Sequence, residues 1–225
     1  VRTYTIGEVE FKMILVDKGT FMMGWGPYTT ETPIHKVTLT KDYYIGETEV
    51  TQALWAAVMG DAPKTGKEEH PIGDVSWNDC VEFTHQINRL VEGVTFRLPT
   101  EAEWEFAAKG GNNSEGYDYS GSSDADRVAW YNANGSGSHP VKQKMANEIG
   151  LYDMSGNIQE WCSDYYATYS KQDAVDPTGP TSSNYGRVAR GGYYSGFKSD
   201  CTCTDRYYWS PSTSDSYFGF RLASY

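Results

Sequence analysis

The sequence predicts an α+β fold: a single loop-rich domain over residues 1–225, with two to three helices around small twisted antiparallel sheets. The chain of 225 residues is long enough to bury a sizeable core. Short alternating apolar runs indicate strands, and three runs that follow helix-capping residues indicate helices. The chain has 7 Trp and 18 Tyr at a mean hydropathy of -0.60, so aromatic side chains must supply much of the core.

The first quarter of the chain is expected to form a small sheet. Val9 to Met23 alternates as two short strands on either side of a turn at Asp17-Lys18-Gly19. Lys36 to Ile45 alternates as one further strand.

Two helices follow this sheet. Thr48 or Thr51 is the N-cap of the first helix, which ends at Gly60. Ser76, with Asp79 three residues later, begins the second helix, which runs to the next glycine.

The third helix has the clearest start. Thr100 and Glu103 have the spacing of a capping box, so we expect a helix from Glu101 to Lys109. Its acidic residues Glu101, Glu103 and Glu105 resemble a catalytic cluster, but residues two apart on a helix do not face each other. We therefore expect these acids to stabilise the start of the helix.

The second half of the chain is expected to consist of loops attached to a small sheet. Residues Gly110 to Ser138 are rich in Gly, Asn, Ser and Asp, which predicts a long ordered loop. The strand-like pieces beyond it include Ala129 to Tyr131, Leu151 to Met154, Arg187 to Arg190 and Phe218 to Leu222.

Charge and hydropathy exclude two classes of partner. The formal net charge is -11, and no run of Lys or Arg offsets it, so we expect no nucleic-acid binding. The longest apolar stretches, such as Met13 to Val16, are far too short to cross a bilayer, so we expect no membrane insertion.

The four cysteines are Cys80, Cys162, Cys201 and Cys203, without a C-x-x-C pair that would indicate zinc. Cysteine is among the most buried residue types, so buried free thiols are one interpretation and a single disulfide is the other. The sequence leaves both open.

Short runs along nearly the whole chain resemble, in order, the formylglycine-generating-enzyme (sulfatase-modifying-factor) superfamily. These runs are Phe21-Met22-Met23-Gly24, Glu49-Val50-Thr51, Val75-Ser76-Trp77, Arg97 to Glu105, Gly150 to Asn157, Glu160-Trp161, Arg190-Gly191-Gly192 and Gly219-Phe220-Arg221. The resemblance implies a C-type-lectin-like α+β fold in which two helices flank twisted antiparallel strands.

The resemblance also bears on catalysis by copper. Oxidase members of the superfamily use two cysteines near the C-terminus, and soft thiolates suit Cu(I). Aligned on Arg190-Gly191-Gly192, Cys201 takes the second of these positions and Gly196 takes the first. We therefore expect no copper and no catalytic residue. The alternative is an oxidase that uses Cys201 with Cys203, or an inactive relative.

The resemblance further implies a structural calcium site at Asp153, Gly156, Ile158 and Glu160, which offer the hard oxygen ligands that calcium prefers. The alternative is that Asp153 is a turn residue and that Glu160 pairs with a buried arginine such as Arg221. Calcium is thus a possible cofactor.

The stretch from Tyr193 to Phe218 differs in composition from the rest of the chain. It mixes aromatic residues with Ser, Asp and Gly, the combination that antibody loops use for recognition. Its aromatic residues follow neither strand nor helix periodicity, so one buried face cannot collect them all and several should lie exposed. The expected ligand-binding residues are Tyr193, Tyr194, Ser195, Phe197, Ser199, Asp200, Thr202, Thr204, Asp205, Tyr207, Tyr208, Trp209, Ser210, Asp215, Tyr217 and Phe218.

This stretch also resembles the variable proteins of diversity-generating retroelements, in which randomised template adenines convert Asn codons into such a set of residues. The resemblance implies a non-enzymatic binding protein, with Cys201, Arg206 and Pro211 kept as scaffold. Its partner would be a protein or cell-surface ligand, and extracellular, cell-surface or virus-particle display is favoured. Neither the ligand nor the oligomeric state follows from the sequence.

The flanks of the stretch indicate how it is held. Gly191-Gly192 and Gly219 have backbones permissive enough for entering and leaving a sheet. Arg206 and Arg221 are long enough to anchor the intervening chain by hydrogen bonds.

Overall fold

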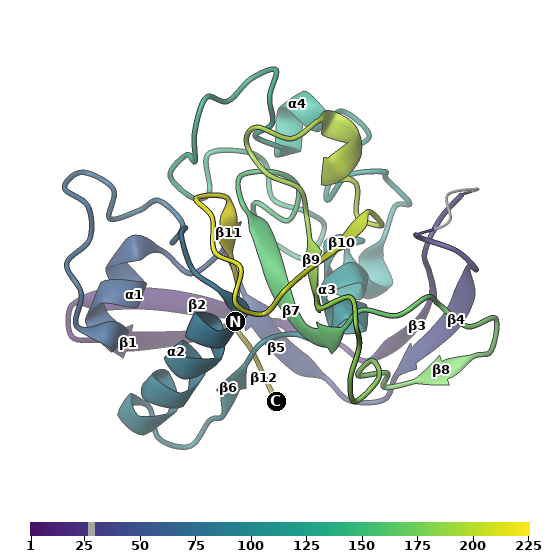
Figure 1. Ribbon diagram of the computed structural model, residues 1–225, viewed down its shortest axis with the longest axis horizontal. Coiled ribbons are helices and arrows are strands. Elements are labelled where there is room, and N and C mark those ends of the chain that lie inside the picture. The colour runs from purple at the N-terminus through teal and green to yellow at the C-terminus, as the bar shows by residue number, and fades with distance from the viewer. Residues whose placement is uncertain (27–29) are drawn as a thin grey trace.

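The computed structural model describes residues 1–26 and 30–225 and has the predicted α+β fold, with helices packed around three sheets (Figure 1). The first sheet is antiparallel, and its strand order is β1-β2-β5-β12-β6. The C-terminal strand β12 lies between β5 and β6, which attaches the end of the chain to its beginning. These strands are β1 (Arg2–Ile6), β2 (Val9–Val16), β5 (Tyr43–Gly46), β6 (Phe96–Arg97) and β12 (Ala223–Ser224).

The second sheet has the order β10-β9-β7-β11, so the stretch from Tyr193 to Phe218 reaches both of its edges. β10 pairs antiparallel with β9, and β11 pairs parallel with β7. Its strands are β7 (Gln159–Tyr165), β9 (Arg187–Arg190), β10 (Arg206–Trp209) and β11 (Phe218–Gly219). The third sheet consists of β3 (Gly19–Met23), β4 (His35–Leu39) and β8 (Ala174–Val175).

Helices α1 (Gln52–Met59) and α2 (Trp77–Leu90) pack against each other beside the first sheet. Thr51 is the N-cap of α1, and Gly60 ends it in the left-handed conformation with φ 83. Ser76 and Asp79 form the predicted capping box of α2. The rings of Trp55 and Phe83 stack with centroids 5.3 Å apart, which joins the two helices through aromatic packing.

Helix α3 (Glu101–Ala108) lies between the second and third sheets, in contact with β3, β7 and β9. Thr100 and Glu103 form its capping box, as predicted. All of its residues are buried, including its three glutamates. A helix enclosed in this way has no solvent face, so its charged side chains must find partners in the protein.

Several sequence predictions of elements were wrong. Lys36 to Ile45 forms two strands, β4 and β5, because residues 40–42 bend the chain into a different sheet. Two stretches that were expected as strands do not form them, although both are largely buried: Ala129 to Tyr131 and Leu151 to Met154. Their backbone groups form hydrogen bonds with loops rather than with a neighbouring strand. The expected loop from Gly110 to Ser138 contains the short helix α4 (Ala125–Val128), which Asp124 caps.

Aromatic side chains fill much of the interior, as the composition predicted. Trp104, Trp161, Phe83 and Phe220 are among the largest fully buried residues. Within residues 1–26 and 30–225, no helix is long and apolar enough to cross a membrane.

Candidate ligand-binding site

The C-terminal segment, defined here as Tyr193–Phe218, leaves the second sheet at two glycines. Gly191 and Gly192 have φ values of 94 and 72, which other residues rarely adopt. A methyl group on Gly192 would lie 2.8 Å from Sγ of Cys201, so only glycine fits this close approach. The chain then makes a 3-10 turn at Lys198–Cys201 and returns as β10.

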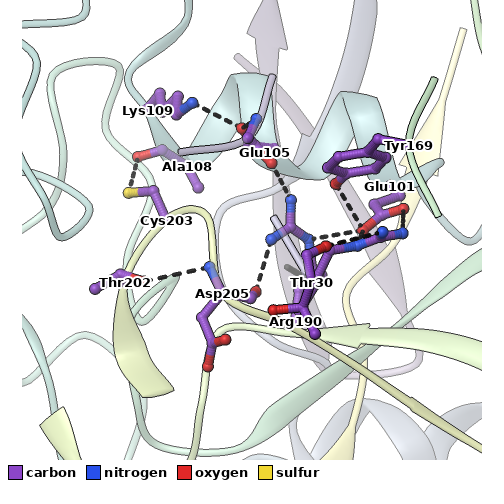
Figure 2. A network of polar contacts seen from close by, with 12 residues as sticks. Thr30, Glu101, Glu105, Ala108, Lys109, Tyr169, Arg190, Thr202, Cys203 and Asp205 are labelled. Carbon is purple, nitrogen blue, oxygen red and sulfur yellow. Dashed lines mark hydrogen bonds and ion pairs between the residues drawn. The ribbon is translucent and has the colours of Figure 1, made fainter. Parts of the chain in front are cut away.

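Two buried arginines hold the returning chain against α3. Arg206 and Arg190 are directly opposite each other on β10 and β9, so their like charges must be neutralised. Arg206 donates from Nε and Nη2 to the two carboxylate oxygens of Glu101, both at 2.7 Å. Arg190 pairs with Glu105 and donates from Nη1 to the carbonyl of Asp205 at 2.6 Å (Figure 2). The predicted anchoring role of Arg206 is confirmed.

The acidic residues of α3 thus do more than cap a helix. Glu103 is the capping residue, as predicted, and it also binds Arg97 with a shortest contact of 2.6 Å. Glu101 and Glu105 instead lie in buried ion pairs with the framework of the C-terminal segment. Glu101 is in the first turn of α3, as expected, and additionally pairs with Arg206, whereas the expectation was wrong for Glu105, which lies beyond the first turn. A buried arginine needs a counter-ion. The strand residues Arg190 and Arg206 were therefore the sequence signal that could have revealed the role of Glu101 and Glu105.

The second anchor is at the end of the segment. Arg221 donates from Nε and Nη2 to the two oxygens of Glu160, both at 2.7 Å. Arg221 also donates to the carbonyls of Gly46 and Tyr152, both at 2.9 Å. The predicted anchoring by Arg221 is confirmed.

The residues predicted to bind a ligand differ in exposure. Phe197 is the most exposed aromatic residue of the C-terminal segment, with 69% of its surface accessible, followed by Tyr208 at 40% and Trp209 at 36%. Ser195, Ser199, Ser210 and Asp215 are also exposed. Tyr193, Tyr194, Asp200, Thr202, Asp205, Tyr207 and Tyr217 are partly exposed.

Phe218 and Thr204 are buried, so their expected place on an exposed face was wrong. Phe218 is in β11, where it stacks on Trp161 with centroids 4.8 Å apart. It also contacts the ring of Trp209 at 5.5 Å, so Phe218 supports the exposed aromatic side chains from below.

Several of the exposed and partly exposed rings pack in two groups. Tyr193 stacks on Tyr217 with centroids 4.4 Å apart, beside Tyr194. Tyr208 packs against Tyr166 at 4.4 Å and Tyr185 at 5.2 Å. Tyr185 is 57% exposed but lies outside the C-terminal segment, and the sequence analysis missed it because only the pairing of β9 with β10 brings it there.

A cleft of about 950 Å³ opens on one side of the segment. Its walls come from three separate parts of the chain: residues 21–25 with 30–34, residues 106–119, and residues 198–207 of the C-terminal segment. We refer to it as the cleft. The C-terminal segment contributes Lys198, Ser199, Asp200, Thr202, Cys203, Thr204, Asp205 and Tyr207 to it.

The four cysteines are free and buried. Cys201 packs with Ala125, Ala129 and Tyr131, whereas Cys203 belongs to the core around α3 and donates to the carbonyl of Ala108 at 3.4 Å. Burial raises the pKa of both thiols, Cys201 and Cys203, to about 12. Burial thus disfavours the thiolate form of both residues in the metal-free fold.

Among the residues predicted to bind calcium, one carboxylate has an oxygen that accepts no hydrogen bond. Asp153 is buried in the left-handed conformation with φ 56, accepts a hydrogen bond from the Lys142 amide, and has Oδ1 without a partner. Glu160 is paired with Arg221, as the alternative interpretation expected, and its Oε2 also accepts from Trp104 at 2.8 Å. Asp153 fits a hard cation better than Glu160 does, and calcium binding here stays a prediction.

Comparisons with known proteins agree with this geometry. The sequence profile of the "Sulfatase-modifying factor enzyme 1-like domain" family matches residues 7–225. The chain is 36% identical to the chaperone protein LppX of Paenibacillus barcinonensis, covering 69% of this chain and 72% of LppX. It is 30% identical to the formylglycine-generating enzyme of Streptomyces coelicolor, covering 88% of this chain and 82% of the enzyme. It spans only 24% of the serine/threonine-protein kinase pkn1 of Chlamydia caviae, to which it is 35% identical.

Among solved structures, the Treponema denticola variable protein 1 superposes with a TM-score of 0.89 at 34% sequence identity. The match covers 99% of this chain and 98% of the other, so it includes the C-terminal segment. It confirms the resemblance to variable proteins and the C-type-lectin-like fold that the sequence runs predicted. With the profile match over nearly its whole length, the chain belongs to the sulfatase-modifying-factor family, which includes the formylglycine-generating enzymes.

Proposed function

We propose that this chain is a non-enzymatic binding protein that displays a variable surface, the C-terminal segment, on a C-type-lectin-like scaffold. The observation that carries the proposal is the similarity to the Treponema denticola variable protein 1 along 99% of the chain. The partner is a protein or another cell-surface ligand. The favoured place of display is outside the cell, on a cell surface or on a virus particle.

The separation of anchors from exposed side chains supports this proposal. Arg206 and Arg190 are buried and hold the segment to α3, while Phe197, Tyr208 and Trp209 point at least partly to solvent. Substitutions at exposed positions away from such anchors usually change stability by no more than about 0.5 kcal/mol. A segment built in this way tolerates sequence change at its surface without loss of the fold.

The chemistry of the exposed side chains also suits recognition. Tyrosine and tryptophan supply large contact areas at a low entropic cost, and serine hydroxyls adapt their hydrogen bonds to different partners. Exposed Ser195, Ser199 and Ser210 lie within two residues of exposed Phe197, Tyr208 or Trp209 in the sequence. Aromatic anchors of this kind usually carry most of the binding energy of an interface.

The second candidate function is a copper oxidase like the formylglycine-generating enzymes, and the similarity to such an enzyme over 88% of the chain favours it. That chemistry needs two adjacent thiolates. Cys201 and Cys203 pack in different clusters, and the first family position is Gly196, where a methyl group would lie 3.0 Å from Oδ2 of Asp200. This arrangement favours the binding protein over the oxidase.

Sequencing the gene in many cells of one population tests the proposal. Substitutions should concentrate at codons of the C-terminal segment whose side chains are exposed, while Cys201, Arg206 and Phe218 stay constant. A near-identical template repeat and a reverse-transcriptase gene beside the locus would support the same conclusion. Substitutions spread evenly over the segment and over the exposed β1–β2 hairpin would contradict it.

A further inference from the structure

Most of the wall area of the cleft is apolar. Trp25 and Ile34 form one side, with 52% and 45% of their surfaces exposed, and Phe21 and Phe106 pack beside each other at 5.1 Å. Tyr207 lines the cleft from the C-terminal segment. Its volume of about 950 Å³ is near the upper end of the usual range for ligand pockets. Such walls hold the apolar stem of a ligand, and aromatic faces attract cations.

A buried carboxylate in this cleft has no counter-charge. Glu31 lines the cleft and is 6% exposed, and its Oε2 has no hydrogen-bond partner. Among the described residues, no salt bridge includes Glu31. A buried charge without a partner is costly, so its presence next to a cavity indicates a partner supplied from outside.

Asp205 adds a second carboxyl group beside Glu31. Burial and the charge of Glu31 raise the pKa of Asp205 to about 7, and Asp200 acts in the same direction. Arg190 opposes this shift, but it is bound to Glu105 and to the main-chain carbonyl of Asp205. Burial and the neighbouring charges of Asp205 and Asp200 raise the pKa of Tyr207, which also lines the cleft. The two acidic groups thus face the same part of the cleft.

The lysines of the cleft do not neutralise this pair. The ammonium of Lys109 is bound to Oε1 of Glu105 at 2.7 Å and to the carbonyl of Met22 at 3.0 Å. Lys198 is exposed on the 3-10 turn at the rim. Within the described part of the chain, no group of three or more His, Cys, Asp or Glu side chains is placed to hold a metal ion. An organic cation therefore suits the cleft better than a metal does.

We propose that the cleft binds an organic cation, a primary ammonium or guanidinium group on an apolar stem, with Glu31 and Asp205 as its counter-ions. A lysine or arginine side chain of a partner protein has this chemistry, and so does a free alkylamine. The inference rests on the proposed function, because it names what the cleft side of the C-terminal segment recognises.

Calorimetric and NMR titration with small probes tests the inference without a protein partner. The probes are N-acetyl-lysine methylamide, N-acetyl-arginine methylamide, cadaverine and the neutral N-acetyl-norleucine methylamide. The charged probes should bind at least about tenfold more tightly than the norleucine probe, a difference of about 1.4 kcal/mol. If both capped amino acids bind, the site recognises lysine and arginine side chains. If only cadaverine binds, the site recognises free amines. Equal binding of the lysine and norleucine probes would overturn the inference.

Two variants and a matched control identify the counter-ions. Glu31→Gln and Asp205→Asn should each weaken binding of the lysine probe about tenfold. Glu92→Gln should leave binding unchanged, because Glu92 is an exposed acid outside both the cleft and the C-terminal segment. Glu31→Gln should also keep or raise the melting temperature, since it removes an unpaired buried charge. Unchanged probe binding in folded Glu31→Gln would contradict the assignment.

A calcium titration completes the test. Calcium should not displace the lysine probe at millimolar concentration, and displacement would overturn the assignment to an organic cation. If the proposed function is wrong but this inference is right, the probes still bind. In that case, substitution of the exposed aromatic residues does not change the binding of any protein partner.

Discussion

Arg206 and Glu101 form a buried bidentate ion pair that joins the C-terminal segment to helix α3. Nε and Nη2 of Arg206 each lie 2.7 Å from a carboxylate oxygen of Glu101, although 105 residues separate the two in sequence. Nη1 of Arg206 also donates to the carbonyl of Ala167 at 2.9 Å. The segment is therefore fixed at its centre, which leaves the exposed residues on either side free to differ in sequence.

Removing one partner of this pair should destabilise the fold strongly. Glu101→Gln leaves the Arg206 charge buried without a counter-ion, which typically costs about 3–5 kcal/mol. Asp173→Asn is the matched control, because Asp173 forms an exposed ion pair with Lys36 and should cost at most about 1 kcal/mol. Urea denaturation measures both changes. Similar losses for the two variants would show that the ion pair is not an anchor.

Aromatic residues of the same segment should differ sharply in their effect on stability. Phe197→Ser should change the free energy of unfolding by no more than about 0.5 kcal/mol, because this ring is exposed. Phe218→Ala should cost about 3–5 kcal/mol, because that ring is buried against Trp161. Thermal and chemical denaturation of the two variants gives the comparison. A large loss for Phe197→Ser would place that ring in the core and remove it from the surface.

Local sequence signals predicted the helices well. Thr51, Ser76 and Thr100 each cap the helix assigned to them, because a capping hydrogen bond depends on residues within one turn. The runs shared with the superfamily predicted the fold, and they also indicated where the C-terminal segment begins and ends.

Long-range pairing could not be predicted in the same way. Phe197 and Phe218 were both expected on an exposed face, and the pairing of β11 with β7 is what places Phe218 in the core. The sequence signals at Glu101 indicated a residue of the first helical turn. Its ion pair with Arg206 could not be foreseen, because the strand that carries Arg206 was not predicted. The cleft was missed for the same reason, since its walls come from three distant parts of the chain.

The four thiols should be unreactive in the native protein. Cys80, Cys162, Cys201 and Cys203 are buried, and burial raises the pKa of each thiol above its usual value. Because the thiolate is the reactive form, a disulfide reagent should label the thiols only after denaturation. Rapid labelling of Cys201 in folded protein, located by peptide mapping, would contradict the burial of this residue.

The same thiol geometry predicts that the chain does not oxidise a cysteine-containing sulfatase-type peptide. Mass spectrometry of such a peptide after incubation with the protein, Cu(I) and oxygen measures this directly. A Cys201→Ser variant is the control for any change seen. A mass loss corresponding to formylglycine that disappears in this variant would restore the oxidase as the function.

Calcium binding depends on Asp153, the carboxylate of the predicted site that has an oxygen without a partner. A ligand that binds only the native state raises its stability, so the melting temperature should increase with calcium concentration. The increase should be absent in Asp153→Asn. Equal melting curves in calcium and in chelator, from protein shown to be metal-free, would show that calcium does not bind at Asp153.

A display library can show whether the C-terminal segment recognises partners while the scaffold stays folded. The library randomises the exposed positions Ser195, Phe197, Ser199, Tyr208, Trp209 and Ser210 and is selected against two unrelated proteins. A control library randomises an equal number of exposed positions on the β1–β2 hairpin. Most members of the first library should fold, and this library should yield a different set of binders for each target, whereas the control library should yield few. Unfolding of most members, or equal yields from the two libraries, would contradict the claim.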